Sequence, residues 1–103
     1  MDERRTEYHH RLKINGRQLH RVIIDQHYQL KHGNDITDKL ILELIDELND
    51  QTFPIQSRRG EFEYFTVEPV YRSRSPYRLV LVLCVTDDYL GVINAFRVKR
   101  RKP

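Results

Sequence analysis

The chain has 103 residues, of which 39% are hydrophobic and 32% are charged. This length suits one domain, and the composition argues against a disordered chain. The longest apolar run, Leu79–Val85, has seven residues, whereas a membrane-spanning helix needs roughly 20. The charged N-terminus leads into no apolar signal sequence, and the single cysteine, Cys84, excludes an internal disulfide. A cytoplasmic protein without membrane contact is therefore expected.

The net charge of +3 is unevenly distributed along the chain. Residues 1–34 carry +3, residues 35–70 carry −6 and residues 71–103 carry +6. Such segregation can give a folded protein a dipolar surface whose basic side attracts polyanions such as RNA. The densest basic stretch is the C-terminal end, which is interpreted either as a phosphate contact or as a solvated tail.

Three segments are expected along the chain. Residues 1–14 are polar and predict a flexible N-terminal segment, residues 15–99 form a single α+β domain, and residues 100–103 are a basic tail. No internal repeat or low-complexity linker marks a second domain.

The first predicted strand begins at Gln18, after the turn signal Asn15-Gly16. Its β-branched run Val22-Ile23-Ile24 favours extended structure, which is expected to continue irregularly to His32.

One amphipathic helix follows, with Asp35 as its expected N-cap and a length of about 14 residues. Its apolar residues recur at three-to-four spacing and form one stripe that needs a sheet or a helix to cover it. These residues are Ile36, Leu40, Ile41, Leu44, Ile45 and Leu48.

A three-stranded antiparallel meander is predicted for the second half of the chain. Its strands are Glu61–Tyr71, Tyr77–Thr86 and Tyr89–Lys99. Pro69 favours an edge position in the first of them, because proline cannot donate to a ladder. The architecture is thus an N-terminal strand, one helix and the meander.

A two-residue loop at Asp87-Asp88 would set the register of the last two strands. The bulkier face is then expected under the helix; it holds Tyr77, Leu79, Leu81, Leu83, Val92, Asn94, Phe96 and Val98. The second face holds Arg78, Val80, Val82, Cys84, Gly91, Ile93, Ala95 and Arg97. It is too apolar to stay bare in water, which implies cover by the N-terminal segment or by a partner chain, and hence a homodimer as one outcome.

The cluster His27, Lys31 and His32 could supply acid–base chemistry, because imidazole titrates near neutral pH. The lysine could stabilise a developing phosphorane charge. The alternative is a polar strand end whose histidines form local hydrogen bonds. A metal site that adds His20 is disfavoured, because period two along a strand would point His27 away from the other two histidines. No metal and no cofactor are expected.

Arginines and tyrosines point to nucleic acid as a partner. In the predicted register Arg78 and Arg97 lie opposite each other, where like charges repel unless an anion lies between them. That anion is either an RNA phosphate or a glutamate of the neighbouring strand. The candidate nucleic-acid-binding residues are Arg58, Arg59, Arg72, Arg74, Arg78, Arg97, Lys99, Arg100 and Arg101. Tyr64, Tyr71 and Tyr77 could stack on bases, or belong to the core.

The order of elements, over about residues 18–100, resembles the small bacterial ribonuclease-toxin superfamily that includes RelE-like toxins, barnase and EndoU-like domains. The segments 27–45 and 88–100 also look like small bacterial proteins of unknown function. The resemblance implies metal-free attack of a 2′-hydroxyl on the adjacent phosphate, served by His, Lys, Arg or Tyr groups. His27, Lys31, His32, Arg78 and Arg97 are the chemically suitable positions here.

Three functions follow from these observations. The first is a small cytoplasmic interaction domain that dimerises, or binds a protein partner, through the second sheet face. The alternatives are a metal-independent, toxin-like endoribonuclease and a non-catalytic RNA-binding module. They differ in whether RNA is bound and whether it is cut.

Overall fold

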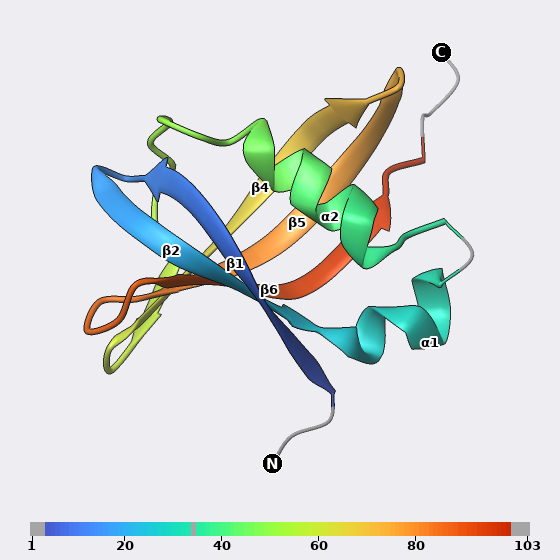
Figure 1. Cartoon of the computed structure of the whole chain (residues 1–103). Coiled ribbons are helices and arrows are strands. Elements are labelled where there is room, and N and C mark those ends of the chain that lie inside the picture. The colour runs from blue at the N-terminus through green and yellow to red at the C-terminus, as the bar shows by residue number, and fades with distance from the viewer. Residues whose placement is uncertain (1–3, 34, 100–103) are drawn as a thin grey trace.

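A mostly antiparallel sheet forms the frame of the molecule (Figure 1). The computed structural model describes residues 4–33 and 35–99, so the predicted tail 100–103 lies outside the described residues. Within them the sheet has six strands, in the order β1-β2-β6-β5-β4-β3, and β2 and β6 run parallel. The strands are β1 (Arg5–Ile14), β2 (Arg17–Asp25), β3 (Ser57–Arg59), β4 (Phe62–Arg72), β5 (Ser75–Cys84) and β6 (Tyr89–Arg97). The predicted α+β class is confirmed, but with more strands than expected.

The N-terminal segment differs from the prediction. Residues 5–14 form β1, which pairs antiparallel with β2 through the two-residue turn Asn15-Gly16. Both turn residues have positive φ, 53° and 75°, as the predicted turn signal requires. A polar sequence can form this strand because β1 is an edge strand, and half of its side chains face solvent.

The predicted irregular strand from Asp25 to His32 is wrong. The chain leaves β2 and forms the one-turn helix η1 (Gln26–Tyr28) and then α1 (Gln29–His32). The Asp25 carboxylate caps η1 by accepting a hydrogen bond from the His27 backbone N–H at 3.0 Å. This cap competes with continued strand pairing and turns the chain.

The predicted amphipathic helix is α2 (Asp38–Asp46), which is shorter than expected at nine residues. Thr37, and not Asp35, is the N-cap, and its hydroxyl accepts from the Leu40 N–H at 3.1 Å. The apolar stripe is confirmed, because Ile41 and Leu44 are fully buried against the sheet. Figure 1 shows α2 lying across one face of the sheet.

The predicted meander is present as β4, β5 and β6. Pro69 lies in the part of β4 beyond its pairing with β3, which ends at Tyr64, and so occupies an edge as expected. The loop between β5 and β6 is four residues long rather than two, because β5 ends at Cys84 and β6 begins at Tyr89.

The predicted register of β5 and β6 is wrong. Arg78 pairs with Phe96, and Arg97 pairs with Tyr77, so the two arginines are not opposite each other. The longer loop shifts the pairing, and a bulge at Ile93 shifts it again.

This bulge also changes which side chains share a face. The β5 residues predicted under the helix, Tyr77 to Leu83 in alternation, are buried there. In β6 the bulge brings Ala95 and Arg97 to the helix-covered side and sends Asn94 and Phe96 to the other side.

The sheet face opposite α2 is named here the open face. The predicted cover by the N-terminal segment is wrong, because β1 extends the sheet at its edge instead of lying over it. None of the helices in the described residues has the length and apolar character that crossing a membrane requires.

Candidate functional site on the open face

A hollow of about 490 Å³ lies on the open face over β1, β2, β4, β5 and β6. Its lining combines aromatic rings, branched aliphatic side chains and one pair of opposite charges. The residues that define this hollow include Arg5, Ile23, Asp25, Phe62, Tyr64, Val82 and Tyr89. A mostly apolar and aromatic lining with a few polar groups is typical of ligand-binding sites.

Gly91 lies in the lining of the hollow. A Cβ atom at this position would lie 2.6 Å from Cγ1 of Val82, its neighbour on β5. The absence of a side chain therefore lets Val82 pack directly over the β6 backbone. Gly91 is thus a point of close packing between β5 and β6.

Asp25 connects the hollow to the predicted histidine cluster. Its carboxylate Oδ1 lies 3.0 Å from His27 Nδ1, and it also accepts from the His27 backbone N–H. Burial acts to raise the pKa of Asp25, but the two hydrogen bonds from His27 outweigh it and hold that pKa below its usual value. The carboxylate thus stays ionised and favours the His27 tautomer that carries its proton on Nδ1.

A second cluster lies farther along β6. Phe96 stacks on His32, with ring centroids 5.3 Å apart, and the Arg78 guanidinium carbon lies 5.6 Å from the centre of the same Phe96 ring. Phe96 and Arg78 share the open face with Val82, because side chains alternate along β5. The structure therefore brings His32 and Arg78 to one aromatic ring on the same face as the hollow.

Arg78 retains unused hydrogen-bonding capacity. Its Nε lies 3.5 Å from Glu68 Oε1, and among the described residues this buried nitrogen has no hydrogen bond. The rest of the side chain is accessible, with 41% of its surface exposed. Glu68 of the neighbouring strand β4 is thus the carboxylate beside Arg78, but it does not lie between Arg78 and Arg97 as expected, because the two arginines are not opposite each other.

The parallel pairing of β2 and β6 sets the distance between the two clusters. Ile24 pairs with Val92, so Asp25 lies level with Ile93. Phe96 is three residues farther along β6, about 10 Å at the usual rise of a strand. The Asp25–His27 pair and the Phe96 cluster thus flank one short stretch of the open face.

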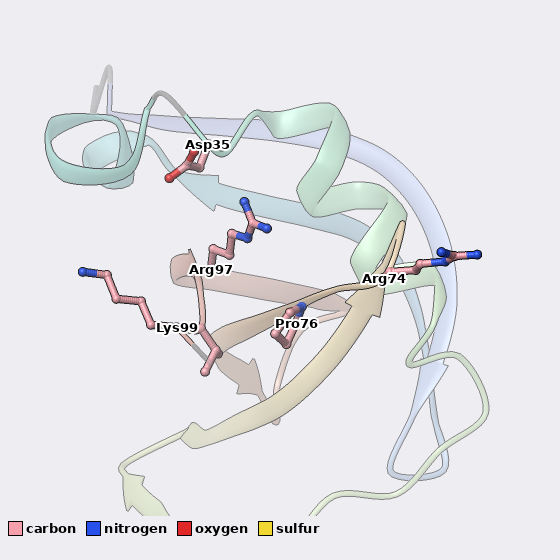
Figure 2. Close-up of a pocket in the computed structure, with 6 residues that line it drawn as sticks. Asp35, Arg74, Pro76, Arg97 and Lys99 are labelled. Carbon is pink, nitrogen blue, oxygen red and sulfur yellow. The ribbon is translucent and has the colours of Figure 1, made fainter. Parts of the chain in front are cut away.

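The other predicted basic residues lie elsewhere. Arg58 pairs with Glu63 at 2.9 Å and Arg72 pairs with Glu43 at 3.1 Å, so local carboxylates neutralise both. Arg59 and Lys31 are exposed, on β3 and α1. Arg74, Arg97 and Lys99 line a separate notch together with Asp35 (Figure 2). Arg100 and Arg101 lie outside the described residues.

The three tyrosines considered for base stacking take different positions. Tyr64 lines the hollow. Tyr77 is in the core with 9% of its surface exposed, and Tyr71 is exposed on β4 at 54%. Of the three, only Tyr64 lines the hollow.

Two more histidines have carboxylate partners. His10 Nε2 lies 2.7 Å from Asp46 of α2, on the helix-covered side, and His20 Nδ1 lies 3.1 Å from Asp88. Among the residues described, no group of three or more His, Cys, Asp or Glu side chains could hold a metal ion.

Asp25, Tyr89 and Phe96 were not predicted as site residues. The spacing Asp25-x-His27 is the signal that could have identified the first, since an aspartate often bonds the residue two positions later. Phe96 could not be found in this way, because a bulge that the sequence does not reveal turns it to the open face.

No protein-family model matches the chain, and comparisons with curated proteins and with solved structures find no match.

Proposed function

We propose that this protein is a metal-independent endoribonuclease that cleaves single-stranded RNA on the open face. One observation carries the proposal: Asp25 both lines the aromatic hollow and hydrogen-bonds Nδ1 of His27. This arrangement leaves Nε2 of an imidazole, oriented by a carboxylate, beside a site suited to a base. Oriented imidazoles of this kind act as general bases at neutral pH.

In the proposed reaction His27 removes the proton from a ribose 2′-hydroxyl. The 2′-oxygen then forms a bond to the adjacent phosphorus, and the bond from phosphorus to the 5′-oxygen of the next nucleotide breaks. His32 donates a proton to that leaving oxygen. The products are a 2′,3′-cyclic phosphate and a 5′-hydroxyl, so the reaction consumes no water and needs no redox partner.

Arg78 is the proposed electrostatic stabiliser of the transition state. Its guanidinium contacts the same Phe96 ring as His32, and its terminal nitrogens are the proposed donors to the two non-bridging phosphate oxygens. Phe96 is a positioning residue, because it contacts both His32 and Arg78. Lys31, adjacent to His32, is exposed and adds positive charge near the same end of the site.

The hollow is the proposed base-binding site. Unpaired bases stack on aromatic side chains, and the rings of Tyr64, Tyr89 and Phe62 line the hollow. A duplex cannot offer its bases in this way, which favours single-stranded RNA as substrate.

The test is an incubation of pure protein with a fluorescent single-stranded RNA in EDTA, with products resolved on a gel. We expect cleavage that yields cyclic phosphate ends and that a single 2′-deoxy substitution at the cleaved position abolishes. His27→Ala/His32→Ala is expected to lower the rate by at least 100-fold, since each general acid or base contributes about 10²–10⁴.

His10→Ala is the matched control, because it also removes a histidine with a carboxylate partner but from the helix-covered side. Its rate should equal that of the unchanged protein. Binding without cleavage would replace the proposal by a non-catalytic RNA-binding module. Neither binding nor cleavage would leave an interaction domain, with the open face as the surface for a protein partner or a second copy.

A further inference from the structure

The notch beside α1 is a second concentration of positive charge, separate from the open-face site. It has a volume of about 560 Å³ and is lined by Asp35, Arg74, Pro76, Arg97, Val98 and Lys99. Arg97 reaches it because the bulge in β6 turns this residue to the helix-covered side. The notch and the Phe96 cluster therefore lie near the same end of β6 but on opposite sides of the sheet.

The three cations of the notch are not neutralised locally. Within the described residues, no hydrogen bond or ion pair holds the side chain of Arg74, Arg97 or Lys99. Asp35 is the one carboxylate in the lining. Arg58 and Arg72, by contrast, each have a glutamate partner. Cations without local partners are available to replace the counterions condensed on a nucleic-acid backbone, which are released on binding.

The directions of these side chains suit an extended ligand better than a single ion. In Figure 2 the side chain of Arg97 rises toward Asp35, whereas those of Lys99 and Arg74 extend to opposite sides of it. Such a spread matches successive phosphates of a chain rather than one phosphate gripped by all three groups.

The backbone at Arg74 adds an independent observation. Ser73 and Arg74 form the two-residue turn between β4 and β5, and both have positive φ, 50° and 67°. Turns of this type favour glycine or asparagine at both positions, and a long side chain there is strained. The turn therefore carries a cation at a position where the backbone would favour glycine.

We infer that the notch binds backbone phosphates of the RNA strand that occupies the open face. The phosphates concerned belong to the nucleotides that extend from the cleaved bond past Phe96. This inference rests on the proposed function, because it assumes RNA on the open face. From Gly91 in the hollow to Arg97 in the notch, β6 advances six residues, about 20 Å. A substrate must therefore extend several nucleotides beyond the cleaved bond to reach the notch.

The test compares a 12-nucleotide RNA with a tetranucleotide, in EDTA, by fluorescence anisotropy for binding and by gel for cleavage. Arg97→Gln/Lys99→Gln is expected to bind the 12-mer about tenfold more weakly. The slope of log affinity against log salt should fall by about 1.4, at about 0.7 per phosphate on a single strand. Cleavage of the tetranucleotide should be unchanged, because it does not reach the notch.

Arg58→Gln/Arg72→Gln is the matched control. It removes the same net charge, but from arginines that already have carboxylate partners. If both double variants weaken binding equally, the effect is one of overall charge and the inference is wrong.

Arg74→Gly separates binding from folding. Glycine relieves the strain at positive φ, so the melting temperature should rise, whereas affinity for the 12-mer should fall. Affinity that stays unchanged in this variant would remove Arg74 from the site.

The two proposals fail in different ways. If the 12-mer is bound in a notch-dependent manner but never cut, the endoribonuclease proposal is wrong and the notch proposal holds for RNA binding alone. If RNA is cut but the notch variants bind and cleave both substrates as the control does, the notch proposal is wrong and the endoribonuclease proposal stands.

Discussion

At the scale of single residues, the carboxylate of Asp38 joins three elements. It accepts hydrogen bonds from the Tyr8 hydroxyl at 2.6 Å and from the Tyr28 hydroxyl at 2.7 Å, and the Gln26 amide donates to it at 2.9 Å. These partners come from β1 and η1, and Asp38 is the first residue of α2. The hydrogen bonds to Asp38 thus hold the helix start against the N-terminal half of the sheet.

Asp38→Asn should lower the pKa of two phenols. The hydrogen bond to Asp38, with burial, raises the pKa of Tyr8 to about 12. Burial, with the hydrogen bond to Asp38, raises the pKa of Tyr28 to about 12. In Asp38→Asn, ultraviolet titration should show both phenols ionising closer to the ordinary value of about 10.

The same shifts predict how stability depends on alkaline pH. A folded pKa above the unfolded one contributes stability that is complete below about pH 10 and is lost as pH rises through about 12. The urea midpoint of the unchanged protein should therefore fall across this window, and that of Asp38→Asn should fall less. Tyr71→Phe, at an exposed tyrosine, is the control and should keep the full decline. An equal decline in Asp38→Asn would contradict the assignment.

At the scale of elements, α2 is held by its apolar stripe rather than by its length. Two and a half turns are too few for a helix to be stable alone in water. Leu44 is fully buried between α2 and the sheet, and Ile36 and Leu48 continue the buried stripe just beyond the helix ends.

Leu44→Ala should therefore be strongly destabilising, by about 2–5 kcal/mol, because it removes buried methyl groups and leaves a cavity. Leu30→Ala is the matched control, since Leu30 on α1 is 85% exposed and should change stability by less than about 0.5 kcal/mol. Urea denaturation followed by circular dichroism measures both. Equal midpoints for the two variants would show that α2 is not packed as described.

The elements also differ in how well they could be predicted. The helical stripe is a local pattern, as is the turn Asn15-Gly16, and both were found from the sequence. The turn of the chain at Asp25 and the bulge at Ile93 depend on one side-chain hydrogen bond and on one extra residue. Such single-residue events leave no periodicity behind, so the strand that was expected to reach His32 and the expected register were wrong.

At the scale of the whole molecule, the parallel pairing of β2 with β6 joins the N-terminal hairpin to the meander. Arg21 supports this junction, because its guanidinium donates to Asp88 at 3.0 Å, to Asp87 at 2.6 Å and to Glu7 at 3.1 Å. The hydrogen bonds to Asp87 and Asp88 raise the pKa of Arg21 above its ordinary value. The loop between β5 and β6 was expected to be a tight two-residue turn. It instead supplies the two aspartates that bind Arg21 of β2.

This arrangement predicts the oligomeric state. The bulge replaces Ala95 and Arg97 on the open face by Asn94 and Phe96, and Arg5 and Asp25 line the hollow beside its aromatic rings, which suits a nucleic-acid strand better than a second copy of the chain. If the open face binds RNA, light scattering at micromolar concentration should give the monomer mass of 12.5 kDa. The opposite result would be a dimer that persists when RNA is added and that Tyr64→Arg converts to a monomer. That result would place a protein interface on the open face.

The sequence by itself determined the α+β class, the apolar stripe of α2, the antiparallel meander and the segregation of charge. These follow from periodicity and composition, which act over a few residues at a time. Only the tertiary structure decided that His32 and Arg78 meet at Phe96 and that Arg97 lies on the other side. The physical reason is that strand register depends on the relative stability of alternative pairings between segments distant in sequence. A shift of one residue moves every following side chain to the other face of the sheet.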